Sequence, residues 1–185
     1  MKGTELIMAG FGGQGVLLAG KILAHAAMAQ GLEVSWLPSY GPEMRGGTAN
    51  VTVCISEERI GSPLITEPKA LLAMNLPSLE KFESKVKPDG VIVINATLIK
   101  KEPHRPDCEC ILVKSKELAE GAGNPKAANL VMLGAYVGAT DILPSSAVED
   151  AIAEAFKGGK EKHVEGSILA FRAGFAQGRM GHAAG

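Results

Sequence analysis

The sequence predicts an α/β fold: a mostly parallel sheet with helices on both faces and a helical C-terminal third. Three observations support this prediction. A glycine-rich turn, residues 10–15, separates a short apolar run from an alanine-rich helical stretch. Short apolar runs then alternate with helical patterns over the first two-thirds of the chain, an order typical of parallel sheets. From residue 115 onward the pattern is helical throughout.

The first elements follow one another with short connections. Residues 5–9 form the first predicted strand, and their apolar side chains suit a parallel strand covered on both faces. The helix at 13–30 ends before Gly31, a residue suited to the position after a helix. A second strand at 33–37 completes a βαβ unit. Further strands are predicted at 48–56, at 69–75, at 91–95 and at 110–113, with a turn at 57–59 and a return strand starting at 60–61.

Helical patterns occupy the remaining segments. They lie at 77–86, 115–121, 124–139, 146–157 and 162–178, followed by a tail at 180–185. Asn124 can cap its helix with Pro125 in the first turn. Ser146 and Glu149 have the spacing of a capping box. With no repeat and no long linker, residues 1–185 are expected to form a single domain.

Composition argues against several classes of partner. The chain has 19 basic and 20 acidic residues and a formal charge of −1, so neither nucleic acid nor a membrane surface is expected to bind it. No apolar run is long enough to span a bilayer, and the N-terminus does not read as a signal peptide. Three cysteines, an odd number, stand at no framework spacing. We expect a cytoplasmic, reduced protein.

The turn Gly10-Phe11-Gly12-Gly13-Gln14-Gly15 matches the dinucleotide fingerprint, so the fold is expected to be Rossmann-like. A helix start offers unbonded N–H groups and a positive dipole end, and glycine lets a phosphate approach. An NAD site also needs an acidic residue at the end of the second strand. Glu33 begins that strand, and its end reads Leu37-Pro38-Ser39-Tyr40, which argues against NAD. A turn without a ligand is the alternative.

A second segment, Ser39-Tyr40-Gly41-Pro42-Glu43-Met44-Arg45-Gly46-Gly47, reads as a functional loop. Arg45 can bind a phosphate or carboxylate through two hydrogen bonds, although a surface pair with Glu43 is an alternative. Both glycine-rich segments leave predicted neighbouring strands at their carboxyl ends, so they should share one crevice. The predicted cofactor-binding residues are Gly10, Gly12, Gly13, Gln14, Gly15, Ser39, Tyr40, Arg45, Gly46 and Gly47.

Other polar residues give weaker signals. Asn95 ends a strand and Asn129 lies within a helix; each fits a satisfied structural amide better than a ligand contact. The four histidines have no ligand partners at metal-binding spacing, so no metal site is predicted. Cys108 and Cys110 are too few for an iron–sulfur cluster, and Cys54 is distant in sequence. No pair of side chains suggests acid–base catalysis, so no catalytic residue is predicted.

Long motifs in the chain resemble the gamma subunit of 2-oxoacid:ferredoxin oxidoreductases. They are Leu37-Pro38-Ser39-Tyr40-Gly41-Pro42-Glu43-Met44-Arg45-Gly46-Gly47, the strand ending at Asn95, and Asn124-Pro125-Lys126-Ala127-Ala128-Asn129-Leu130-Val131-Met132-Leu133-Gly134. The resemblance implies a complex that oxidatively decarboxylates a 2-oxoacid to its acyl-CoA and passes electrons to ferredoxin. It also implies that this module helps to bind coenzyme A.

Thiamine diphosphate and the [4Fe-4S] clusters are then expected in partner chains, the alpha and beta subunits with or without a ferredoxin-like delta subunit. The isolated chain should be inactive. The run Ile60-Gly61-Ser62-Pro63 and the motif Pro38–Gly47 resemble subunits that act on 2-oxoglutarate, with branched-chain 2-oxoacids and pyruvate close behind. Two other hypotheses stay open: a stand-alone nucleotide-binding oxidoreductase and a purely structural subunit.

Overall fold

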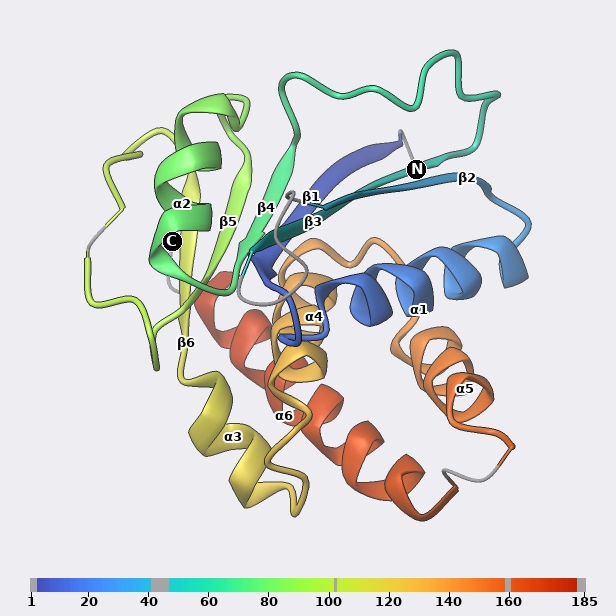
Figure 1. Ribbon diagram of the computed structural model, residues 1–185. Helices are drawn as coiled ribbons and strands as arrows, with labels where there is room; N and C mark the ends of the chain where they lie inside the picture. The colour runs from blue at the N-terminus through green and yellow to red at the C-terminus, as the bar shows by residue number, and fades with distance from the viewer. Residues whose placement is uncertain (1–2, 41–46, 102, 159–160, 183–185) are drawn as a thin grey trace.

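The computed structural model describes residues 3–40, 47–101, 103–158 and 161–182 (Figure 1). Within them, six strands form one sheet in the order β2-β3-β1-β4-β5-β6. Strands β1, β4, β5 and β6 are parallel, whereas β3 runs antiparallel to both β1 and β2. The bounds are β1 (Thr4–Phe11), β2 (Glu33–Tyr40), β3 (Thr48–Ser56), β4 (Ala70–Ala73), β5 (Val91–Asn95) and β6 (Glu109–Val113).

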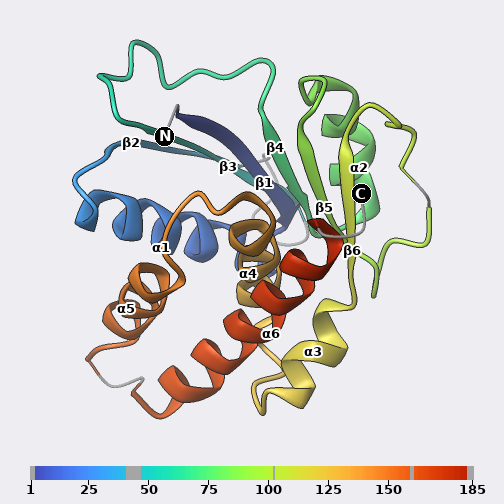
Figure 2. The same cartoon turned by 180° about the vertical axis from the view of Figure 1, so that it is seen from behind.

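The helices lie unequally on the two faces of the sheet (Figures 1 and 2). One face carries most of them and the larger core, whereas α2 covers a smaller core on the other face. No helix in the described ranges is long and apolar enough to cross a membrane. The bounds are α1 (Val16–Ala29), α2 (Leu76–Phe82), α3 (Ser115–Gly121), α4 (Ala128–Thr140), α5 (Ser145–Ala155) and α6 (Val164–His182), with 3-10 turns at Glu83–Lys85 and Glu161–His163.

Helix α4 is the centre of the larger core. Every residue from Asn129 to Ala139 is buried. Helix α6 crosses α4 at glycine positions, and the two backbones approach so closely that a Cβ on Gly174 would lie 1.9 Å from the carbonyl oxygen of Val131. This close packing fixes the start of α4, which forms part of the candidate site.

The structure corrects the predicted strands near the second loop. Ser39 and Tyr40 belong to β2, which extends past the predicted end at residue 37. Pro38 is tolerated because β2 is an edge strand, where a missing N–H need not break a ladder on both sides. β3 lies between β1 and β2, so the two glycine-rich segments do not leave neighbouring strands. The return strand predicted from residue 60 is absent from the described segment 57–69.

The predicted N-terminal caps of two helices were also wrong. Helix α4 begins at Ala128, and residues 124–127 form a turn in which Ala127 N–H donates to the Asn124 carbonyl. Helix α5 begins at Ser145 after Pro144, with no side-chain cap. Glu149 instead accepts a hydrogen bond from Arg172 Nε at 2.9 Å, because α6 lies alongside. An ion pair with a neighbouring helix has replaced the predicted capping box.

Candidate functional site

The glycine-rich turn joins β1 to α1 at the carboxyl edge of the sheet. Gly13 (φ 95°) and Gly15 (φ 75°) adopt left-handed conformations that L-residues rarely occupy. Gly15 is the residue before α1 and has no side-chain cap. No hydrogen bond between described residues uses the backbone N–H of Gly13 or Gly15. The turn therefore presents backbone donors at the positive end of a 14-residue helix.

Gln14 holds the turn in shape. Its Oε1 accepts hydrogen bonds from Phe11 N–H at 2.7 Å and from Asn75 Nδ2 at 3.1 Å. Its Nε2 donates to the Met74 carbonyl at 3.4 Å, at the end of β4. Gly10 is needed beneath it, since a Cβ there would lie 2.7 Å from Gln14 Oε1. Gln14 and Gly10 thus build the turn, while the N–H groups of Gly13 and Gly15 make no hydrogen bond to another described residue.

The two glycine-rich segments do meet, although their strands are not neighbours. Gly12 N–H donates to the Gly47 carbonyl at 3.0 Å. Ser39 and Tyr40 pair with Asn50 and Ala49 across the β2–β3 ladder. Arg45 and Gly46, both predicted to bind the cofactor, lie outside the described residues. The structure therefore brings Gly47 to the turn and leaves Ser39 and Tyr40 on the far side of β3.

A cavity of about 230 Å³ opens beside the turn, between the starts of α1, α4 and α6. Its wall combines apolar side chains from α1 and α4 with the ring of Phe156. Lys126 and His163, both exposed, supply its basic groups, and among the described residues no acidic side chain lines it. The lining residues are Gly13, Gln14, Gly15, Leu18, Asn124, Lys126, Ala127, Asn129, Leu130, Phe156, His163 and Ser167.

The sequence interpretation missed Lys126 and His163. Lys126 stands inside the motif at 124–134, which was a usable signal. His163 was considered only as a metal ligand. The two residues line the same cavity as the glycine turn because α4 packs against α1 and α6 packs against α4. Local sequence carries no sign of that arrangement.

Two buried amides brace this region through hydrogen bonds to backbone carbonyls, as predicted for structural amides, and Asn129 also lines the cavity. Asn129 Nδ2 donates to the Gly15 carbonyl at 3.0 Å. Asn95 Nδ2 donates to the Met74 carbonyl at 3.2 Å, and its Oδ1 accepts from Ser115 Oγ at 2.7 Å. These hydrogen bonds connect Gly15, which lines the cavity, to α4, and they connect the end of β5 to the start of α3.

The cysteine and tyrosine groups with shifted pKa values lie away from this cavity. Burial raises the pKa of the Cys110 thiol to about 11, with a smaller contribution from Cys108. Burial likewise raises the pKa of Cys54 and Cys108. All three stay protonated thiols near neutral pH, so none is an activated nucleophile. No group of three or more metal-ligating side chains occurs in the part of the chain that the structure describes.

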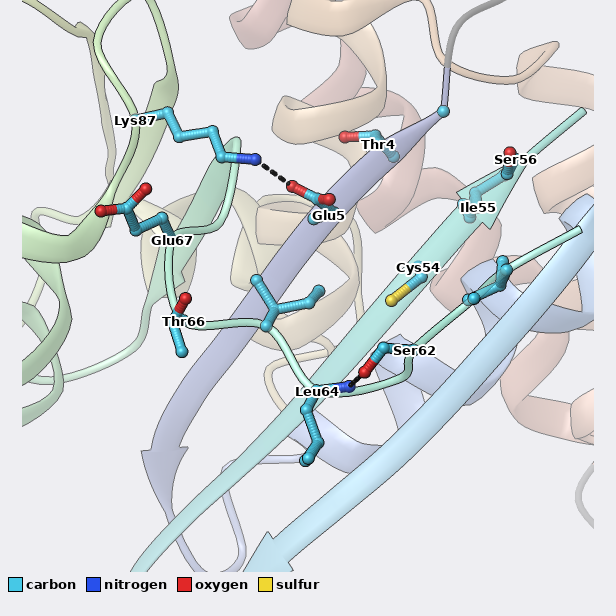
Figure 3. Close-up of a pocket in the computed structure, with 14 residues that line it drawn as sticks. Thr4, Glu5, Cys54, Ile55, Ser56, Ser62, Leu64, Thr66, Glu67 and Lys87 are labelled. Carbon is cyan, nitrogen blue, oxygen red and sulfur yellow. Dashed lines mark hydrogen bonds and ion pairs between the residues drawn. The ribbon is translucent and has the colours of Figure 1, made fainter. Parts of the chain in front are cut away.

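A larger cavity, about 510 Å³, lies at the opposite, amino-terminal edge of the parallel strands (Figure 3). Glu5, Glu67 and Lys87 supply charges to it. Lys87 Nζ lies 2.7 Å from Glu5 Oε2, so its charge is already paired. Without an unpaired basic group or a glycine turn, this cavity is a poor site for an anion. The smaller cavity beside the turn is the candidate site.

Comparison with known proteins identifies the family. Residues 5–177 match the pyruvate ferredoxin/flavodoxin oxidoreductase family. Ketoisovalerate oxidoreductase subunit VorA of Methanothermobacter marburgensis is 42% identical over 172 residues, a match covering 90% of this chain and 35% of VorA. The chain therefore spans about a third of that relative.

A second relative has a length close to that of this chain. The 2-oxoglutarate synthase subunit KorC of Methanocaldococcus jannaschii is 34% identical over 175 residues, covering 92% of this chain and 91% of KorC. The crystal structure of a keto/oxoacid ferredoxin oxidoreductase gamma subunit from Geobacter sulfurreducens has the same fold. It superposes with a TM-score of 0.82 at 31% identity, covering 96% of this chain and 99% of the other. The chain belongs to the pyruvate ferredoxin/flavodoxin oxidoreductase family, as a module of the gamma-subunit type.

Proposed function

We propose that this chain is the gamma subunit of a 2-oxoacid:ferredoxin oxidoreductase and that its candidate site binds a phosphate group of coenzyme A. The observation that carries this proposal is the composition of the cavity wall. Gly13 and Gly15 offer N–H donors that no described residue uses, Lys126 and His163 offer basic side chains, and no acidic side chain of the described part of the chain lines the cavity with them. Phosphate oxygens are the acceptors such donors suit best.

The cavity takes only part of the cofactor. Pockets that enclose a whole drug-sized ligand have volumes of about 300–1,000 Å³, and this one has about 230 Å³. The apolar side chains of Leu18 and Phe156 line the same space. A phosphate and an adjoining apolar group would fit there, while the rest of coenzyme A extends from the protein. This chain then holds and orients a co-substrate whose thiol reacts elsewhere.

The remaining chemistry belongs to partner chains. We place thiamine diphosphate and the [4Fe-4S] clusters in alpha and beta subunits, with or without a ferredoxin-like delta subunit. A cluster takes four cysteine ligands and this chain has three, and burial raises the pKa of the Cys54, Cys108 and Cys110 thiols, which does not suit a nucleophile. The isolated chain, one domain over residues 1–185, is therefore inactive. The complex works in the cytoplasm.

The 2-oxoacid is 2-oxoglutarate in this proposal, with ketoisovalerate as the second candidate. KorC, named as a subunit of 2-oxoglutarate synthase, is matched over almost its whole length. VorA, named for ketoisovalerate, is more similar in sequence but only a third of it is matched. Turnover of the purified complex with each 2-oxoacid decides between them.

Calorimetry with coenzyme A tests the binding proposal, on the complex and on the chain alone. Charged hydrogen bonds contribute about 1.5–3 kcal/mol, so Lys126→Ala should weaken binding roughly 10- to 100-fold. Lys116→Ala is the matched control: this exposed lysine on α3 does not line the cavity. Binding of NAD(H) or a flavin instead would support the stand-alone oxidoreductase. No coenzyme A affinity, with full turnover after Lys126→Ala and Arg45→Ala, would support the purely structural subunit.

A further inference from the structure

Large exposed apolar side chains gather at one edge of the sheet. Tyr40 ends β2 and Phe11 ends β1, while Leu76 and Leu98 come three residues after β4 and β5. Tyr40 is 67% exposed, Leu98 57%, and Phe11 and Leu76 both 37%. β1, β2, β4 and β5 all run in one direction, because β3 is antiparallel to both β1 and β2. Their carboxyl ends therefore lie along the same edge, which we call the carboxyl edge.

Three segments at the carboxyl edge contain no charged residue: 11–15 after β1, 75–78 after β4 and 95–98 at the end of β5. Charges occur elsewhere along it: the segment after β6 carries Lys114, Lys116 and Glu117, and the sequence after Tyr40 contains Glu43 and Arg45, which lie outside the described residues. At the opposite edge, each of the segments 57–59, 67–69, 87–89 and 105–109 carries two or more charges. Single exposed apolar residues are normal, but a row of them on uncharged segments is typical of the centre of a protein–protein interface.

The relatives indicate what covers this edge. The region that matches this chain makes up about a third of the length of VorA but nearly the whole length of KorC. The same domain is therefore part of a longer polypeptide in one relative and almost a whole chain in the other. A contact that is made within one chain in VorA must be made between chains where the module stands alone. A row of exposed apolar side chains on uncharged segments is the surface that such a contact needs.

We infer that the carboxyl edge, defined by Phe11, Tyr40, Leu76 and Leu98, docks a second polypeptide that is homologous to the part of VorA outside the matched module. The proposed function gives the contact a purpose, and this part of the inference rests on it. The glycine turn lies at the same edge. Coenzyme A held there must reach chemistry carried by another chain, so that chain has to face this edge.

Charge-introducing variants test the inference. The tagged full-length chain is purified from its source with its accompanying chains, which are identified by mass spectrometry and then produced separately as the binding partner. Leu98→Glu and Leu76→Lys should each weaken assembly at least tenfold. Leu64→Glu should leave assembly unchanged, because Leu64 is highly exposed in the connector at the opposite edge. Hydrogen exchange in the complex should protect 11–15, 75–78 and 95–98.

Several outcomes would overturn the inference. These are wild-type assembly by both edge variants, protection centred on 57–67, an accompanying chain unrelated to VorA, or an edge that binds only a second copy of this chain. Thermal unfolding of each variant shows that it is folded. A failure of the proposed function can be distinguished from a failure of this inference. If the edge variants weaken assembly but Lys126→Ala leaves coenzyme A affinity unchanged, only the proposed function is contradicted.

Discussion

Asn129 Nδ2 donates a hydrogen bond of 3.0 Å to the carbonyl of Gly15, joining residues 114 positions apart in the chain. Asn129 stands in the first turn of α4, the most buried helix, and Gly15 precedes α1. The bond therefore fixes the glycine turn to the centre of the core. Through this bond α4 orients the Gly15 carbonyl and the neighbouring N–H groups of Gly13 and Gly15, which we propose to bind phosphate.

Replacing Asn129 should therefore affect both stability and ligand binding. Asn129→Ala removes one of the two hydrogen bonds to the Gly15 carbonyl, which also accepts from Ala19 N–H at 3.0 Å, so the free energy of unfolding should fall by about 0.5–1.5 kcal/mol. Urea unfolding measures it, and calorimetry measures the accompanying drop in coenzyme A affinity. Asn95→Ala is the control. It removes an equally buried amide that bonds Met74 and Ser115, so it should lower stability and leave coenzyme A affinity intact.

The turn itself can be tested with two glycines of nearly equal φ. A Cβ on Gly15 (φ 75°) would lie 2.6 Å from Asn129 Nδ2, whereas a Cβ on Gly31 (φ 77°) meets nothing within 4 Å. Gly31→Ala should cost only the backbone strain of a left-handed alanine, about 1–2 kcal/mol. Gly15→Ala should cost more and abolish coenzyme A binding. Equal losses of stability for the two variants would contradict the proposed role of the Asn129 contact.

The order of strands and helices could be predicted because it depends on local patterns. Apolar runs, helical spacing and the glycine turn are all readable within short windows of sequence. The position of β3 could not be predicted, because the pairing of a hairpin strand with β1 depends on a surface formed by distant residues. Pro38 also misled the interpretation: it reads as a loop residue, but an edge strand accommodates it.

The candidate site was predictable only in part, for the same reason. The turn at 10–15 has a local signature, and Gly47 meets it through a backbone hydrogen bond. The basic groups Lys126 and His163 come from segments more than 100 residues away. Only the packing of α4 against α1, and of α6 against α4, reveals that they line the same cavity as the turn.

Alkaline pH should destabilise the protein through Cys110. Burial raises the pKa of its thiol from 9.0 to about 11 in the folded state. The folded protein therefore holds this proton more tightly than the unfolded chain does. Its contribution to stability is complete below pH 9 and is lost as the pH rises to about 11. Urea unfolding at several pH values checks this, and Cys110→Ala should flatten the decline across that window. An unchanged slope in the variant would show that other groups cause it.

Close packing of α4 against α6 predicts the largest loss of stability. A Cβ on Gly174 would lie 1.9 Å from the carbonyl oxygen of Val131. The three atoms nearest to this Cβ all belong to the Val131 backbone, so no side chain can rotate away to make room. Gly174→Ala should thus separate the helices and cost about 3 kcal/mol or more. Gly181 lies in the same helix, and a Cβ there would make ordinary contacts of 3.6 Å with Ile111. Gly181→Ala should be neutral or stabilising by about 0.5–1 kcal/mol, because alanine favours helix. Thermal unfolding of both variants decides the point: similar midpoints for the two would mean that the helices do not meet through their glycines.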